Sequence, residues 1–465
     1  MPERVDPWQR RREAALLLAA AALAYANSFA GAYQFDDFTV IADEPAVQSL
    51  AAWWDSMPGM RPLLKLSWAL NHASGLGLAG MHASNLAVHA ACALGCWSLL
   101  RLWLPQAGFD PARSGRAAWV AAMVFALHPA QTEAVTYLSG RSMALMALFS
   151  LATLSLGLRA ARPSDWRWPA SALCFAAALL VRETAWAALP ALALLALARG
   201  EPVRQLAWRV APLAAIVLVA AAIFWTMPVY RALALGTLAR HDAGALVATQ
   251  VEAVFYLLTR PLLLLELNID PDLRPQAGID GSGALRAVAL AAIAAVAAWQ
   301  WRPRPWLAAA LLWPFVMLAP GYSLFARADV ANDRHLYLAL LGPSVIAGAA
   351  IASLPRRVSA AATVFLCALL GLVTVGRNED YRSESALWRA TAACSPDKAR
   401  VWNNLGFALM NDGDLDGARA ALSRALALEP GYQKAFHNLA AVEARRRRND
   451  CPPGCEPDGA PPAQR

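Results

Sequence analysis

Two adjacent carboxylates, Asp36 and Asp37, follow the first apolar segment of the chain. They stand near the start of a stretch, residues 31–82, that is too polar to enter lipid. A carboxylate just outside a membrane span is suited to act as a general base at the bilayer surface. It is equally suited to cap the next helix or to mark the membrane boundary. The spacing of the two residues leaves these alternatives open.

Other ionisable side chains lie in loops predicted at the same end of the spans as the acidic pair. Such groups are costly near lipid and are usually functional or paired, so we interpret the clustering as a cavity that faces outward. Arginine binds phosphate oxygens through two parallel N–H bonds. The residues assigned to a donor phosphate are Arg141, Arg182, Arg334 and His335. The residues assigned to the remainder of the substrate are Arg61, His128, Glu133 and Glu183.

Several of these assignments have a structural alternative. Pro129 ends a predicted span, so His128 would cap that span while Glu133 starts the next helix. Arg182 and Glu183 would form a self-satisfied pair in a tight turn. Residues 332–338 would anchor a span at the interface through an aromatic side chain. No pair of histidines makes a convincing metal site and no D-x-D pattern accompanies Asp36 and Asp37, so the sequence predicts no metal.

The composition identifies the class of protein. Of the 465 residues, 58% are hydrophobic and only 16% are charged, which excludes a soluble globular protein. The net charge of +8 comes from arginines in short clusters between apolar segments, and it therefore indicates membrane topology rather than binding to nucleic acid. The sequence predicts an all-α, polytopic membrane protein.

The distribution of arginines predicts eleven transmembrane helices with residues 1–12 in the cytoplasm. Residues 31–82 form the first outer loop, with amphipathic helices at 44–55 and 61–71. We interpret residues 245–267 as a re-entrant or interfacial helix pair, because a full crossing would place later arginines outside. The predicted spans lie at about 13–30, 83–103, up to 128, 138–159, on both sides of 182–184, up to 227, 283–301, 306–320, 336–354 and 358–376.

A soluble helical pattern follows the last span. Several residues fall at the offsets of a 34-residue tetratricopeptide repeat, which is a helix pair: Trp402, Leu405, Gly406, Leu409, Ala418, Leu422, Ala425 and Pro430. Pro396 lies 34 residues before Pro430, so the pattern indicates one full repeat flanked by a half on each side. We predict a repeat domain over residues 377–445 that packs on the membrane domain or binds a partner. Residues 446–465 are predicted to be disordered.

Five stretches together resemble one family, the transmembrane-and-tetratricopeptide-repeat O-mannosyltransferases, of which the chain resembles a bacterial relative. They occur in this order: Phe35-Asp36-Asp37 with Glu44-Pro45-Ala46-Val47, Arg61-Pro62-Leu63 with Asn71, His128-Pro129 through Ser139-Gly140-Arg141, Arg182-Glu183-Thr184, and Asp333 through Leu338. The resemblance implies a C-type glycosyltransferase (GT-C) fold over residues 13–376. It implies a metal-independent, inverting reaction with a polyprenyl-phosphate-linked sugar, and it places the essential acidic residue of the first outer loop at Asp36 or Asp37.

The function expected from this resemblance is transfer of a sugar, mannose in the named family, to Ser or Thr hydroxyls of secreted or periplasmic proteins. No cofactor is expected besides the lipid-linked donor. We expect the protein in a bacterial inner membrane, with its repeats in the periplasm docking a protein acceptor. One alternative keeps the fold and transfers the sugar to a glycan or lipid. Another is a non-catalytic scaffold or transporter that recruits partners through the repeats.

Overall fold

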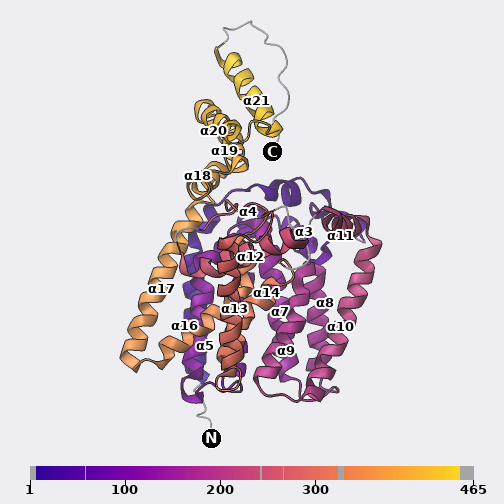
Figure 1. The fold of residues 1–465 in the computed structure, drawn as a ribbon, viewed down its shortest axis with the longest axis vertical. Helices are drawn as coiled ribbons and strands as arrows, with labels where there is room; N and C mark the ends of the chain where they lie inside the picture. Colours follow the sequence, from indigo (N-terminus) through magenta and orange to yellow (C-terminus); the bar gives the residue numbers. More distant parts are fainter. Residues whose placement is uncertain (1–6, 58, 241–242, 265–266, 323–328, 451–465) are drawn as a thin grey trace.

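The computed structural model describes residues 7–57, 59–240, 243–264, 267–322 and 329–450, and these residues form helices, turns and loops without a strand. The predicted all-α class is confirmed. A bundle of apolar helices carries a smaller stack of helices at one end (Figure 1). We call this end of the bundle the repeat end and the opposite end the far end.

The apolar helices of the bundle alternate between the two ends. Their bounds are α1 (Pro7–Ala24), α4 (Gly77–Trp103), α5 (Pro111–Leu127), α7 (Arg141–Arg159), α8 (Arg167–Val181), α9 (Ala188–Ala198), α10 (Val203–Thr226), α13 (Gly281–Gln300), α14 (Pro305–Leu318), α16 (Leu341–Ser353) and α17 (Arg356–Glu379). Every predicted span overlaps one of these helices. By length and composition, six of the described helices can cross a membrane, or seven if a bent pair made by residues 333–339 and 341–353 is one span. The total of eleven stays a prediction.

The packing of the bundle is that of a membrane protein. In the interior, α5 packs along α16, and Gly348 permits this close approach because a Cβ there would overlap the backbone of α5. The outer helices α10, α13 and α17 expose large apolar side chains instead, including Leu218, Leu285 and Phe365. Such exposure on long apolar helices indicates contact with lipid.

Shorter helices connect the spans at the repeat end. They are α2 (Leu50–Asp55), α3 (Pro62–Ser74), α6 (Thr132–Val135), α11 (Pro228–Arg240), α12 (Ala243–Thr259) and α15 (Leu336–Ala339). The predicted helix at 44–55 is shorter than expected, because a separate 3-10 turn at Pro45–Val47 precedes α2 and Ser49 caps it. The first outer loop also ends earlier than residue 82, since α4 begins at Gly77.

The predicted helix pair at 245–267 is a single helix, α12, followed by a 3-10 turn at Arg260–Leu262. Pro261 lacks an amide hydrogen and so favours the end of α12. Residues 265–266 of this predicted pair lie outside the described residues.

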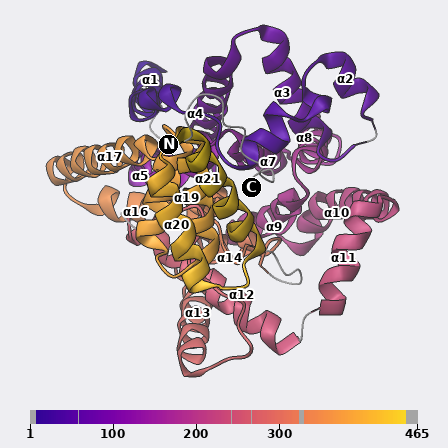
Figure 2. The same cartoon turned by 90° about the horizontal axis from the view of Figure 1, so that it is seen from above.

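The C-terminal stack consists of α18 (Glu384–Cys394), α19 (Ala399–Asp412), α20 (Leu415–Leu428) and α21 (Gln433–Asp450). Its core includes Trp388, Leu405, Leu409 and Leu422, so the predicted periodicity corresponds to packed helix pairs. Residues 446–450 of the predicted disordered tail are the last residues of α21, and residues 451–465 lie outside the described part. Seen from the repeat end, the stack covers one side of the bundle and leaves α2, α3, α10 and α11 uncovered (Figure 2).

Candidate functional site

A cavity of about 320 Å³ lies where the bundle meets the repeats, and we call it the joint cavity. It combines the first outer loop, α6, the segments before α13 and α15, and the repeats. Its lining is rich in charged groups: Phe35, Asp36, Glu133, Tyr137, Ile269, Asp270, Asp329, Asn332, Arg334, Trp388 and Arg400. Among the described residues, no group of three His, Cys, Asp or Glu side chains is placed to hold a metal ion.

Asp36 presents its carboxylate to this cavity. The side chain is 40% exposed, and its Oδ2 lies 3.9 Å from a terminal guanidinium nitrogen of Arg334. The backbone N–H of Asp36 donates to the hydroxyl of Tyr137 at 3.0 Å. Burial raises the pKa of Asp36, and the charge of Arg334 opposes this rise. Asp36 is therefore a carboxylate that a substrate can reach, as a general base requires, and Arg334 lies beside it.

Asp37 occupies a different environment, because its side chain is fully buried. One carboxylate oxygen accepts the backbone N–H of Gln34 at 3.0 Å. The other accepts the backbone N–H of Ser139 at 2.7 Å and also the Ser139 hydroxyl. Burial raises the pKa of Asp37 to about 7. Asp37 thus ties the first outer loop to the turn before α7, and its position does not offer a base to a substrate.

The backbone around this anchor is tightly constrained. Gly140 closes the turn that contains Ser139, and a Cβ at this position would overlap the carbonyl oxygen of Glu133. Phe35 has φ +36°, in the left-handed region that non-glycine residues rarely adopt. Strained backbone of this kind persists where the surrounding contacts fix it, and it is frequent at functional sites.

Glu133 and Arg334 form the floor of the joint cavity. The backbone N–H of Arg334 donates to Glu133 Oε2 at 2.8 Å, and the Nε of Arg334 lies 3.7 Å from Oε1. Burial raises the pKa of Glu133 to about 8, against the lowering effect of Arg334. Glu133 therefore positions Arg334, whose guanidinium lies between this carboxylate and Asp36.

Arg61 and Glu183 form an ion pair that joins the first outer loop to the α8–α9 turn. The Nε of Arg61 donates to Glu183 Oε2 at 3.0 Å. Arg182 donates to the Ser142 hydroxyl at 2.9 Å. Its charge also acts on Glu183 and, after that of Arg61, lowers the pKa of this carboxylate. The charges of Arg61 and Arg334 are close enough to repel each other. Both guanidiniums therefore lie near each other at the repeat end.

Arg141 is not placed to bind a donor phosphate, contrary to the prediction. Its side chain is 1% exposed. Its nitrogens donate to the side-chain oxygens of Asn71 and Asn85, both at 2.6 Å, and to the carbonyl oxygens of Ser67 and Met81 at 3.1 and 3.0 Å. These contacts use the guanidinium to hold α3, α4 and α7 together.

His128 also serves the fold. Its Nδ1 accepts the backbone N–H of Ala130 at 3.1 Å, and its Nε2 lies 3.1 Å from the carbonyl oxygen of Pro261. Burial lowers the pKa of His128 to about 4, so the ring is neutral. The capping alternative describes this residue, because backbone groups of the fold occupy both ring nitrogens.

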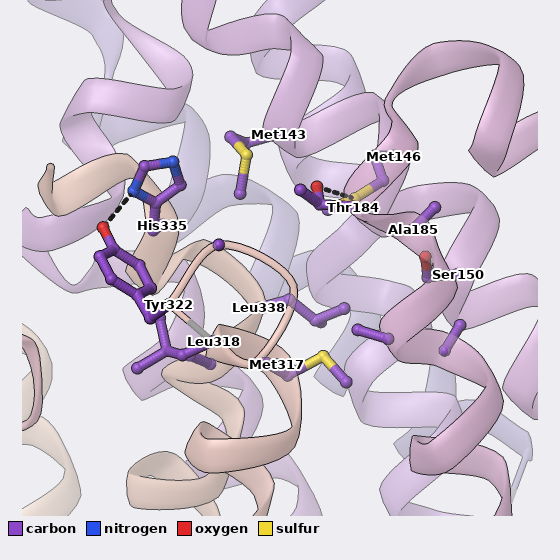
Figure 3. A pocket seen from close by; sticks show the side chains of 14 residues that line it. Met143, Met146, Ser150, Thr184, Ala185, Met317, Leu318, Tyr322, His335 and Leu338 are labelled. Carbon is purple, nitrogen blue, oxygen red and sulfur yellow. Dashed lines mark hydrogen bonds between the residues drawn. The ribbon is translucent and has the colours of Figure 1, made fainter. Parts of the chain in front are cut away.

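A second cavity, which we call the apolar cavity, lies between α7, α9, α14 and α15 (Figure 3). It is partly open, and about 460 Å³ of space lies between its lining atoms, including the part open to solvent. Its walls include Met143, Met146 and Met317. His335 lines this cavity rather than the joint cavity, and its Nδ1 lies 2.6 Å from the hydroxyl of Tyr322. Flexible methionine side chains adapt to a hydrocarbon, so this cavity is suited to an apolar chain.

The repeats supply two side chains to the joint cavity that the sequence did not assign to it. Trp388 packs edge-on against Phe35 with ring centroids 5.5 Å apart. Arg400 donates from Nε to Asp270 Oδ2 at 2.8 Å and from a terminal nitrogen to Asp329 Oδ1 at 2.6 Å. Tyr137 and Asp270 were likewise missed. Of these residues, only Arg400 could have been found from the sequence, because it lies at the start of a predicted repeat helix, where the repeats could contact the bundle.

Comparisons with known proteins agree with this architecture. Residues 399–432 match the family described as Tetratricopeptide repeat. The chain is 29% identical over 157 residues to Protein O-mannosyl-transferase TMTC3 of Mus musculus, an alignment that covers 30% of this chain and 16% of that protein. It is 30% identical over 121 residues to Protein O-mannosyl-transferase Tmtc2 of Drosophila melanogaster, covering 25% of this chain and 13% of that protein. The predicted resemblance is confirmed, over a small part of these relatives' length.

One solved structure was also similar. The arabinosyltransferase EmbB of Mycobacterium smegmatis aligns with 84% of this chain and 43% of its own chain. The sequence identity in this alignment is 18% and the TM-score is 0.38.

Proposed function

We propose that this relative of the O-mannosyltransferases is a membrane glycosyltransferase. It transfers a sugar, mannose by its resemblance, from a polyprenyl-phosphate-linked donor to Ser or Thr hydroxyls of secreted or periplasmic proteins. The observation that carries the proposal is the accessible carboxylate of Asp36 in the first outer loop, 3.9 Å from the guanidinium of Arg334. This geometry supplies a proton acceptor beside a cation in one cavity.

In the proposed step, the oxygen of the acceptor hydroxyl forms a bond to the anomeric carbon while the bond from that carbon to the phosphate oxygen breaks. The hydroxyl proton passes to the carboxylate of Asp36. The electron pair of the broken bond leaves with the lipid phosphate, whose charge Arg334 offsets. Attack from the face opposite the phosphate inverts the configuration. Because a guanidinium already stabilises this leaving group, the proposal requires no metal.

We propose that the donor lipid uses both cavities. His335, which lines the apolar cavity, directly follows Arg334 of the joint cavity, and Thr184 of the apolar cavity lies two residues from Arg182. We propose that Arg334 and Arg182 hold the phosphate and that the apolar cavity receives the first part of the prenyl chain. Apolar surface buried there contributes about 25 cal/mol per Å² to binding.

The contribution of the repeats to the joint cavity favours a protein acceptor over a glycan or lipid. Trp388 and Arg400 line the same cavity as Asp36. An extended peptide held by the repeats would therefore reach the carboxylate without leaving their surface. Under this proposal the repeats lie in the periplasm and residues 1–12 lie in the cytoplasm of a bacterial inner membrane.

A transfer assay tests the proposal. Purified protein in proteoliposomes receives polyprenyl-phosphate-mannose with a radiolabelled sugar and a set of secreted proteins. We expect labelled protein, unchanged by EDTA, and a loss of about 10²- to 10⁴-fold in rate for Asp36→Asn. Asp43→Asn is the matched control, because Asp43 is an exposed acid in the same loop. Equal rates for Asp36→Asn and the wild type would refute the proposed base, and label in lipid or glycan alone would refute the protein acceptor.

A further inference from the structure

A third cavity lies at the far end of the bundle, away from the joint cavity, and we call it the basic cavity. It contains about 910 Å³ of empty space, open on one side, where α7 ends and where α8 and α10 begin. Four of its lining residues are arginines, namely Arg159, Arg167, Arg199 and Arg209, and one is an acid, Glu201. The proposed transfer reaction uses none of these residues.

The arginines of this cavity exceed the carboxylates that pair with them. Glu201 accepts from Arg209 at 2.8 Å and lies 3.3 Å from a terminal nitrogen of Arg199, so one carboxylate serves two guanidiniums. Arg209 and Glu201 are both more than nine-tenths buried at their side chains. One positive charge of this triad is therefore uncompensated in a site that is largely shielded from water, where its field is strong.

The other two arginines add to this excess. Arg159 is exposed, donates to the hydroxyl of Ser98 at 3.1 Å and forms no ion pair with a residue in the described part of the chain. Arg167 lies 3.2 Å from Asp165, a carboxylate outside the cavity lining. Counting both Glu201 and Asp165, the arginines still outnumber the carboxylates by two.

The surroundings of the cavity indicate the membrane interface. Trp166 is 66% exposed, and the guanidinium of Arg167 lies 5.5 Å from the centre of its ring. Exposed tryptophans at the ends of spans mark the level of lipid headgroups. Leu102 and Leu158 add apolar wall beside the arginines. A ligand that fills this cavity meets both cations and apolar side chains.

We propose that the basic cavity binds the phosphate headgroup of an anionic phospholipid, with the acyl chains along the adjoining helices. Guanidinium groups match phosphate oxygens in planar, bidentate geometry, and basic pockets between spans select anionic headgroups. A soluble phosphate would use the charges but leave the apolar wall without a partner. The excess of two positive charges suits a headgroup with one or two phosphates.

Binding of defined lipids tests this proposal. The full-length protein, purified in neutral detergent, is titrated with cardiolipin, phosphatidylglycerol, phosphatidylcholine or inorganic phosphate, and bound lipid is measured by native mass spectrometry. We expect cardiolipin and phosphatidylglycerol to bind at least tenfold more tightly than phosphatidylcholine. Equal binding of phosphatidylcholine would overturn the proposal, and so would competition by millimolar inorganic phosphate that displaces the lipid completely.

Two double variants separate the cavity from general surface charge. Arg159→Gln with Arg167→Gln removes two lining cations, and we expect about a 10- to 30-fold weaker affinity for the anionic lipids. Arg356→Gln with Arg357→Gln removes two exposed cations at the start of α17, also at the far end but outside the cavity, and should change the affinity less than threefold. If the first pair unfolds the protein, Arg159→Gln alone gives the same comparison, because Arg159 is exposed. Equal losses for cavity and control variants would overturn the proposal.

Discussion

The two aspartates of the acidic pair should respond differently to replacement by alanine. We expect Asp37→Ala to lower the stability of the fold, and Asp36→Ala to abolish activity while the protein stays folded. Asp37→Ala removes the acceptor of three buried hydrogen bonds and leaves two backbone N–H groups and one hydroxyl in a dry environment. Each buried donor without a partner costs about 1–3 kcal/mol. If the Ser139 hydroxyl rotates to another acceptor, we expect a loss of about 3–5 kcal/mol in the free energy of unfolding.

Asp36→Ala should cost far less. Its carboxylate is 40% exposed, and its ion pair with Arg334 spans 3.9 Å, a class of contact worth about 0–1 kcal/mol. Its backbone N–H bond to Tyr137 survives the substitution. We therefore expect Asp36→Ala to remain folded and to be inactive.

The assay is unfolding in mixed micelles with increasing SDS, followed by tryptophan fluorescence, together with sugar transfer by the fraction that remains folded. Asp43→Ala serves as the exposed control for both measurements. The reasoning would be refuted by an Asp37→Ala protein that is as stable as the wild type, or by an Asp36→Ala protein that unfolds as readily as Asp37→Ala.

Three further predictions follow from the same geometry. Arg141→Lys should destabilise the protein by about 2–4 kcal/mol, because an ammonium cannot reach all the acceptors of the buried guanidinium. The folded fraction should keep the wild-type KM for the donor. A raised KM would show that Arg141 contacts the donor phosphate after all. Arg400→Gln should lower the stability of the contact between the repeats and the bundle by about 2 kcal/mol. In the full-length protein, the repeats should then become sensitive to limited proteolysis and sugar transfer should fall. Arg424→Gln breaks a surface pair and should have none of these effects. Transfer should be lost as pH falls, because protonation removes the base. Since burial raises the pKa of Asp36, the acid limb of the pH profile of kcat/KM should lie above the ordinary aspartate pKa of 3.8. An acid limb at or below 3.8 would assign the proton transfer to another group.

The features that the sequence predicted are those with a local period or a local composition. The repeat helices follow from apolar residues such as Leu405, Leu409 and Leu422, whose spacing sets a buried face within one helix pair. The positions of the spans follow from runs of apolar residues bounded by arginines. Neither signal requires knowledge of which helix lies next to which. The number of crossings depends on that neighbourhood and on tilt, so it was the weakest part of the topology.

The site was harder to predict because its chemistry depends on long-range contacts. Asp36 and Asp37 are identical in type and adjacent in sequence, and only the approach of Ser139 makes one of them a structural anchor. Arg141 looked like an interfacial cation, yet two asparagines, Asn71 and Asn85, bury it. Arg400 lies more than three hundred residues from Asp36 and reaches the cavity through the packing of the repeats.

The ion-paired seam made by Arg400, Lys398 and Asp270 has a consequence for engineering and for evolution. A repeat array attached only through the last span could be exchanged for another array, and the protein would then bind different partners. Here the array itself forms one wall of the joint cavity, so a transplanted array would need equivalents of Trp388 and Arg400 to close that cavity. We therefore expect new partner specificities to evolve by the addition of repeats after α21, while the sequences of the helices next to the bundle stay unchanged.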